Sequence, residues 1–192
     1  MGNLLERRVL SAAAWIGTEL TDSEAWTISL DSRQIDELRN ASQSILESSR
    51  GWEQVESSDY ALPNWAEIIS RMRSSLEGGL GFALIRALPL TDVSADTARL
   101  MLWGIGQHLG YPEPQDAAGN LLHDVKDTGK DLATNNIRAY QTNLPINYHN
   151  DGADAFMLLC CTAAETGGRS RLVSAISVFN EILARRPDLA HR

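Results

Sequence analysis

Tyr148-His149-Asn150-Asp151, with the apolar run Phe156-Met-Leu-Leu-Cys-Cys161 that follows it, is the stretch from which the fold can be inferred. The apolar run has the length and composition of a buried β-strand. Within a strand, residues two apart point to the same face and lie about 6–7 Å apart along the chain. The His149 imidazole and the Asp151 carboxylate would then converge on one metal ion. The stretch predicts a sheet with two metal ligands, although a loop histidine beside a turn aspartate has the same sequence.

A glycine-rich turn comes after the apolar run, in the sequence Glu165-Thr-Gly-Gly-Arg-Ser170. Its paired glycines permit a tight turn or a close approach of backbone to a ligand. The hydroxyl of Ser170 would begin the next strand. By itself the turn is more typical of an ordinary glycine hairpin. Its position directly after the His-x-Asp motif and the apolar strand makes it informative.

Outward from this stretch, the chain divides into a helical first part and a strand-rich second part. Capping residues predict helices that begin at Asp31, at Asn64 and at Asp92 or Ser94, and a last helix spans about 175–186. Strands are expected at 26–30, 81–86, 121–125, 138–142, 156–162 and 171–173. Helices followed by short strands indicate an α+β fold whose sheet is of the sandwich or barrel kind.

Composition and charge restrict the partners and the compartment. The 192 residues are 43% hydrophobic and 22% charged, as in an ordinary globular protein, and the net charge is -8. Such a charge disfavours nucleic acid or an anionic membrane surface as a partner. The adjacent Cys160 and Cys161 do not suit a structural disulfide, and we interpret them as buried small hydrophobes in a strand. A reducing, cytoplasmic location is expected.

The order of these motifs resembles the TauD/TfdA family of Fe(II)- and 2-oxoglutarate-dependent dioxygenases (taurine dioxygenase-like). The resemblance rests on Gly81-Phe-Ala-Leu-Ile-Arg-Ala-Leu-Pro89, Gly106-Gln-His-Leu-Gly110, the His-x-Asp motif, and Gly167-Gly168 through Asn180-Glu181. It implies part of a double-stranded β-helix, or jelly roll, of the clavaminate synthase-like kind. Residues 1–80 resemble the family only loosely. We therefore expect a helical N-terminal region over 1–80 and the N-terminal half of the dioxygenase domain over 81–192.

The resemblance also implies a chemistry. His149 and Asp151 would be the first two Fe(II) ligands, and Ser170 matches the family's hydroxyl near the 2-oxoglutarate carboxylate. The implied reaction uses O2 and couples oxidative decarboxylation of 2-oxoglutarate to hydroxylation of a C–H bond in a small organic substrate. The protein holds the reactants in register, because the difficult chemistry belongs to the cofactor.

Candidate substrate residues lead into the metal motif. Tyr140, Gln141 and Asn143 would line the mouth of the pocket. On a strand Tyr140 and Gln141 point to opposite faces, so both cannot line the same wall. Plain sheet surface is the alternative interpretation of these three residues.

Two further family residues, a second histidine ligand and an arginine for the far carboxylate of 2-oxoglutarate, are expected well downstream of the glycine turn. The remaining histidines and the C-terminal arginines do not suit these roles, since they follow the turn too closely or suit structural roles: His108, His123, His191, Arg185, Arg186 and Arg192. The chain therefore resembles a family member truncated at its C-terminus. Half a jelly roll would leave sheet edges unpaired, which favours self-association.

Three hypotheses remain open from the sequence. The first is a dioxygenase, and the second is an inactive, truncated remnant that serves as a metal-binding or interaction module. On either, we expect the isolated chain to bind iron weakly and to turn over slowly or not at all. The third, a cupin-like metal protein, would need more histidines near the strands than this sequence has.

Overall fold

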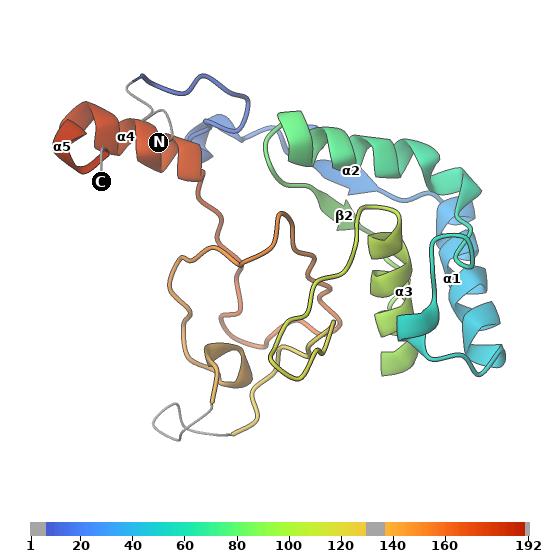
Figure 1. Ribbon diagram of the computed structural model, residues 1–192. Coiled ribbons are helices and arrows are strands. Elements are labelled where there is room, and N and C mark those ends of the chain that lie inside the picture. The colour runs from blue at the N-terminus through green and yellow to red at the C-terminus, as the bar shows by residue number, and fades with distance from the viewer. Residues whose placement is uncertain (1–6, 130–136, 191–192) are drawn as a thin grey trace. The chain divides into compact units, whose positions relative to one another are not determined.

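A computed structural model describes residues 7–129 and 137–190 (Figure 1). The chain forms two compact units. The first consists of the described residues of Met1–Gly110 and Met157–Arg192, and the second is Tyr111–Phe156. The described residues form a mixed structure that is mostly helical and contains two short parallel strands.

The first unit holds nearly all of the regular structure. Its α-helices and strands are β1 (Thr27–Ser29), α1 (Ser32–Glu47), α2 (Ala66–Gly78), β2 (Leu84–Arg86), α3 (Ala95–Gln107), α4 (Ala175–Arg185) and α5 (Pro187–Ala190). Its 3-10 helices are η1 (Gly17–Glu19), η2 (Ser23–Ala25), η3 (Trp52–Gln54) and η4 (Pro63–Trp65). In the second unit the described residues form η5 (Ala139–Gln141). Figure 1 shows α1, α2 and α3 grouped with the two strands.

Two of the three predicted helix caps are confirmed. Asp31 caps α1, because its Oδ1 accepts the Gln34 N–H at 2.9 Å while Gln34 Oε1 accepts the Asp31 N–H at 2.9 Å. Ser94 and Ser174 cap α3 and α4. The predicted cap at Asn64 is wrong. Both its backbone N–H and its side-chain amide bond Glu37 of α1, and α2 begins two residues later.

The two strands confirm the predictions for 26–30 and 81–86, although each is shorter than expected. They pair in parallel, with Ile28 opposite Ile85. A parallel pair requires a crossover connection, which α1 and α2 provide here. The helices pack with one another around an apolar core, in which Leu38, Trp65 and Met101 are almost fully buried.

The centre of this core contains a polar pair. The Tyr60 hydroxyl bonds Ser42 Oγ and also donates to the Leu38 carbonyl at 3.3 Å, and both side chains are fully buried. Burial raises the pKa of Tyr60 to about 12. Gly104 of α3 lies directly against the Tyr60 ring, so a larger residue at position 104 has no room.

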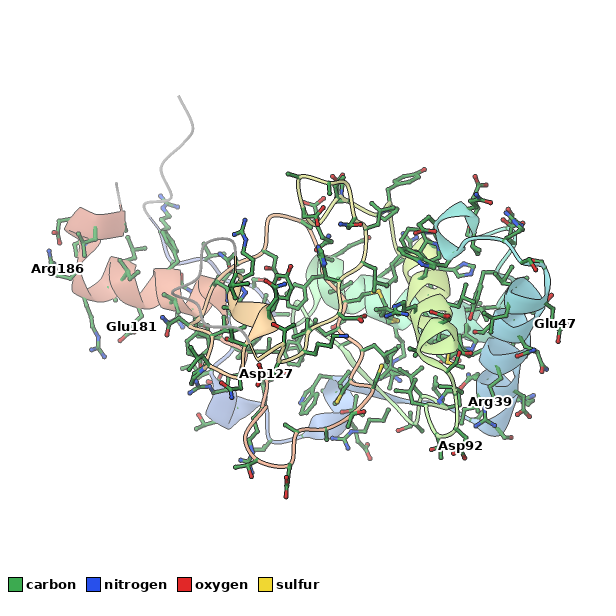
Figure 2. All side chains as sticks on the ribbon, turned by 90° about the horizontal axis from the view of Figure 1, so that it is seen from below. Arg39, Glu47, Asp92, Asp127, Glu181 and Arg186 are labelled. Atoms are coloured by element: carbon green, nitrogen blue, oxygen red, sulfur yellow. The ribbon has the colours of Figure 1, made fainter. Side chains whose placement is uncertain are left out.

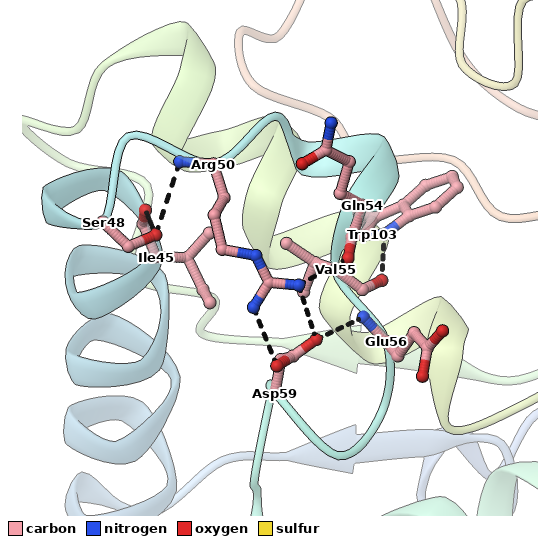
Figure 3. A network of polar contacts seen from close by, with 8 residues as sticks. All are labelled: Ile45, Ser48, Arg50, Gln54, Val55, Glu56, Asp59 and Trp103. Carbon is pink, nitrogen blue, oxygen red and sulfur yellow. Dashed lines mark hydrogen bonds and ion pairs between the residues drawn. The ribbon is translucent and has the colours of Figure 1, made fainter.

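A network of polar contacts closes the loop between α1 and η4 (Figure 3). Arg50 donates from both terminal nitrogens to Asp59, at 2.8 and 3.0 Å, and to the Gln54 carbonyl at 2.7 Å. The Arg50 guanidinium, together with the Glu56 N–H, lowers the pKa of Asp59 to about 2. Trp103 Nε1 donates to the Val55 carbonyl at 2.9 Å, which attaches the loop to α3.

Four predicted strands are wrong. The described residues of 121–125, 138–142, 156–162 and 171–173 are irregular or form η5, so they contain no jelly-roll sheet. A strand is stabilised by pairs with a neighbouring strand, and among the described residues only β1 and β2 pair. Phe156, Leu158 and Leu172 consequently remain exposed. Cys160 and Cys161 are exposed as well, which corrects the expectation that they are buried.

Charged side chains cover the outer surfaces of the helices. Figure 2 shows Arg39 and Glu47 on α1 and Glu181 on α4, all exposed, projecting from the ribbon. Among the described residues, no helix is both long and apolar enough to span a bilayer.

Candidate metal centre

The His-x-Asp motif lies in the second unit, on irregular backbone rather than on the expected strand. Even so, its two side chains approach each other. His149 Nε2 is 3.6 Å from Asp151 Oδ1. About half of each side chain is exposed, so an ion from solvent can reach both. A separation of two residues along an irregular segment therefore suffices to bring imidazole and carboxylate together.

The His149 ring is oriented by its other nitrogen. Nδ1 is 2.8 Å from the Asn147 carbonyl oxygen, which can only accept, so Nδ1 carries the hydrogen. In a neutral imidazole the lone pair then lies on Nε2, the nitrogen that faces Asp151. A backbone carbonyl bonded to the far nitrogen is the usual support of a metal-binding histidine.

The donor set fits a divalent first-row metal in part. Two ligands at about 2.1 Å from one ion and at right angles to each other are about 3.0 Å apart, and the observed 3.6 Å needs only a small adjustment of exposed side chains. Imidazole with carboxylate suits Fe(II). In the part of the chain that is described, no third His, Cys, Asp or Glu joins them.

The glycine turn with Ser170 belongs to the first unit. Gly167 and Gly168 have φ values of 78° and 66°, in the left-handed region that favours glycine. A Cβ at Gly168 would also lie 2.8 Å from the Cβ of Ala164. The turn thus requires glycine, and it leaves Ser170 exposed, four residues before the N-cap of α4.

The three candidate substrate residues adopt a different local structure from the one expected. Tyr140 and Gln141 lie in η5, so the alternation of a strand does not apply to them. Thr128 holds this turn, because its backbone N–H and its hydroxyl both donate to the Gln141 carbonyl at 2.9 Å. Asn143 lies just beyond and is exposed.

A second histidine–aspartate pair lies in the same unit. His123 Nε2 is 3.3 Å from Asp116 Oδ2, and the His123 ring packs against Tyr140 with centroids 5.4 Å apart. Asp116 also accepts from the Asn120 side chain and from the Asn120 and Ala118 N–H groups, which lowers its pKa. The pair could not be anticipated from the sequence, because Asp116 and His123 are seven residues apart on irregular backbone, where no helix or strand period brings side chains together.

The other residues that were set aside have structural partners or lie outside the described chain. His108 Nε2 bonds the Tyr60 carbonyl at 2.7 Å, which confirms its structural role. Arg185 pairs with Glu181, and Arg186 pairs with Asp188 at 2.6 Å. His191 and Arg192 lie outside the described residues.

Comparisons with known proteins place the chain in one family. Residues 45–192 match the model of the family described as "Taurine catabolism dioxygenase TauD, TfdA family". FR-33289 synthase of Streptomyces rubellomurinus is 28% identical over 190 residues, which are 98% of this chain and 56% of that protein. Taurine hydroxylase-like protein SAT17 of Stachybotrys chartarum is 21% identical over 184 residues, 92% of this chain and 48% of that protein. The chain spans about half the length of these curated relatives, and it belongs to the TauD/TfdA dioxygenase family.

Proposed function

We propose that this chain carries the iron-binding portion of an Fe(II)- and 2-oxoglutarate-dependent dioxygenase that hydroxylates a small organic substrate. The observation that carries the proposal is the approach of His149 Nε2 to Asp151 Oδ1, 3.6 Å apart, with the ring oriented by the Asn147 carbonyl. Membership of the family supports the same reaction class. Ser170 is proposed to bond the 2-oxoglutarate carboxylate.

Each residue has a separate task in this proposal. The Asn147 carbonyl holds the His149 Nδ1–H, so that Nε2 presents its lone pair to the metal. Asp151 supplies an anionic oxygen that offsets part of the metal's charge. When bound, Fe(II) with O2 and 2-oxoglutarate supplies the oxidising power for C–H hydroxylation, and 2-oxoglutarate leaves as succinate and CO2.

The substrate is proposed only as a class, a small organic molecule. Tyr140, Gln141 and Asn143 precede the metal motif by a few residues and belong to the same unit. We assign them to the substrate side of the centre. One relative is named as a taurine hydroxylase-like protein, which supports a small organic substrate. We also propose that 81–192 is the N-terminal half of a jelly-roll domain that 1–80 precedes.

The alternative function is a metal-binding or interaction module without turnover. It is favoured by one observation, namely that no third His, Cys, Asp or Glu joins the pair among the described residues. Such a module would bind Fe(II) through His149 and Asp151 but would not bind 2-oxoglutarate to the metal.

An anaerobic titration of the full chain with Fe(II) and then 2-oxoglutarate tests the proposal. A weak visible charge-transfer band is expected when 2-oxoglutarate chelates the iron, and it should disappear in His149→Ala. His123→Ala is the matched control, because it removes the other histidine that faces an aspartate in the same unit. Iron binding without the band would support the module instead. Equal loss of iron in both variants would refute the assignment of His149.

A further inference from the structure

Residues 9–15 lie beside α4 and are held there through their backbone (Figure 1). The Asn180 side chain makes two hydrogen bonds to the Val9 backbone. Its Oδ1 accepts the Val9 N–H at 2.8 Å, and its Nδ2 donates to the Val9 carbonyl at 2.9 Å. Ser177 Oγ donates to the Trp15 carbonyl at 2.7 Å, and Ser174 Oγ donates to the Ala13 carbonyl. We call residues 9–15 the strap.

The three side chains that bind the strap are three residues apart, so they share one face of α4. Ser174 and Asn180 are only 6% and 9% exposed. The apolar Val178 and Ile182 of the same helix are instead 44% and 37% exposed. The helix therefore buries polar groups against a backbone. This arrangement stabilises the helix only while the strap satisfies those groups.

Trp15 connects the strap to the segment that leads into β2. Trp15 Nε1 donates to the Leu80 carbonyl at 2.8 Å, and the Trp15 ring meets Phe82 edge-on with centroids 5.5 Å apart. Phe82 lies two residues before β2. A continuous series of contacts thus runs from the β2 side of the unit through the strap to Ser174, the N-cap of α4.

Ser174 also ends the glycine turn segment, four residues after Ser170. We infer that the strap positions Ser170, and that Asn180, Ser177 and Ser174 are positioning residues that act through the start of α4. This inference rests on the proposed function only in assigning Ser170 to 2-oxoglutarate. The strap precedes the stretch that matches the family model, which begins at residue 45.

Limited trypsin digestion of the full chain, without metal, tests the coupling. Arg8 directly precedes Val9, and Arg171 lies between Ser170 and Ser174. Trypsin binds several residues on each side of the cleaved bond, so release of Val9 or Ser174 from its hydrogen bonds frees more chain around Arg8 or Arg171 for cleavage. Cleavage rates then report the population of the opened form.

Ser177→Ala removes one strap bond and is expected to accelerate both cleavages together, by about fivefold. Asn180→Leu removes two bonds and should accelerate them further, whereas Ser177→Thr keeps the hydroxyl and should restore wild-type rates. Ser174→Asp keeps the helix cap but loses the donor to Ala13, so it separates capping from strap binding. Cleavage after Lys126, in the second unit, is the internal control.

Faster cleavage after Arg8 with unchanged cleavage after Arg171 would overturn the inference, because the strap would then be only a local tether. Unchanged cleavage at both bonds would overturn it too. If Asn180→Leu fails to fold, the cleavage rates of Ser177→Ala and of its control Ser177→Thr decide whether the strap and the Arg171 segment open together. The iron titration of the wild-type chain is a separate measurement, so loss of its band refutes the proposed function and leaves the coupling result standing.

Discussion

Gly104→Ala should destabilise the first unit. A Cβ at position 104 would lie 2.5 Å from Tyr60 Cζ and against two further ring atoms. The ring has no room to move, because Tyr60 is fully buried and its hydroxyl bonds Ser42 and the Leu38 carbonyl. Overpacking of this kind costs about 1–3 kcal/mol, and we take the upper end.

The helix itself opposes this effect, since alanine in place of glycine stabilises a helix interior by about 1 kcal/mol. The expected net loss is therefore about 2 kcal/mol in the free energy of unfolding. For a unit of this size that loss lowers Tm by about 4–8 °C. Urea unfolding and thermal melts followed by circular dichroism would measure both quantities.

Gly106→Ala is the matched control on the same helix. Its Cβ would meet Met157 Sδ at 3.7 Å, an ordinary contact, so this variant should be as stable as the wild type or up to about 1 kcal/mol more stable. Equal stability of Gly104→Ala and Gly106→Ala would refute the packing described around Tyr60.

Three further predictions concern the same unit. The lowered pKa of Asp59 means that its ion pair with Arg50 stabilises the fold fully above pH 3.8 and less as the pH falls toward about 2. In urea unfolding, the free energy of unfolding of Asp59→Asn should therefore fall less on acidification than that of the wild type. The raised pKa of Tyr60 means that the contribution of its neutral hydroxyl to stability is fully present below pH 10 and declines toward about pH 12. Melts of Tyr60→Phe at alkaline pH should lack this decline. Ser94→Ala should cost about 1 kcal/mol in urea unfolding and Ser94→Asp should restore it, because Ser94 Oγ caps α3 through the Thr97 N–H at 3.1 Å; equal stability of the alanine variant would contradict the cap.

The sequence determined the features that depend on neighbouring residues. Asp31 caps α1 as predicted, with Gln34 completing a capping box, and the start of α3 at Ser94 follows the same local chemistry. The proximity of His149 and Asp151 could also be anticipated, because two residues of backbone keep the side chains close on a strand or on a loop. The glycine turn was equally predictable, since positive φ values require residues without a Cβ.

Tertiary structure alone decided the features that need a distant partner. The segments at 121–125, 138–142, 156–162 and 171–173 have apolar residues typical of strands, yet a strand forms only where another strand pairs with it. The hydrogen bonds between Asn180 and Val9 join residues 171 positions apart, and no local sequence pattern predicts them. Local hydrogen bonds can be inferred from residue order, whereas pairing and burial depend on which parts of the chain meet in space.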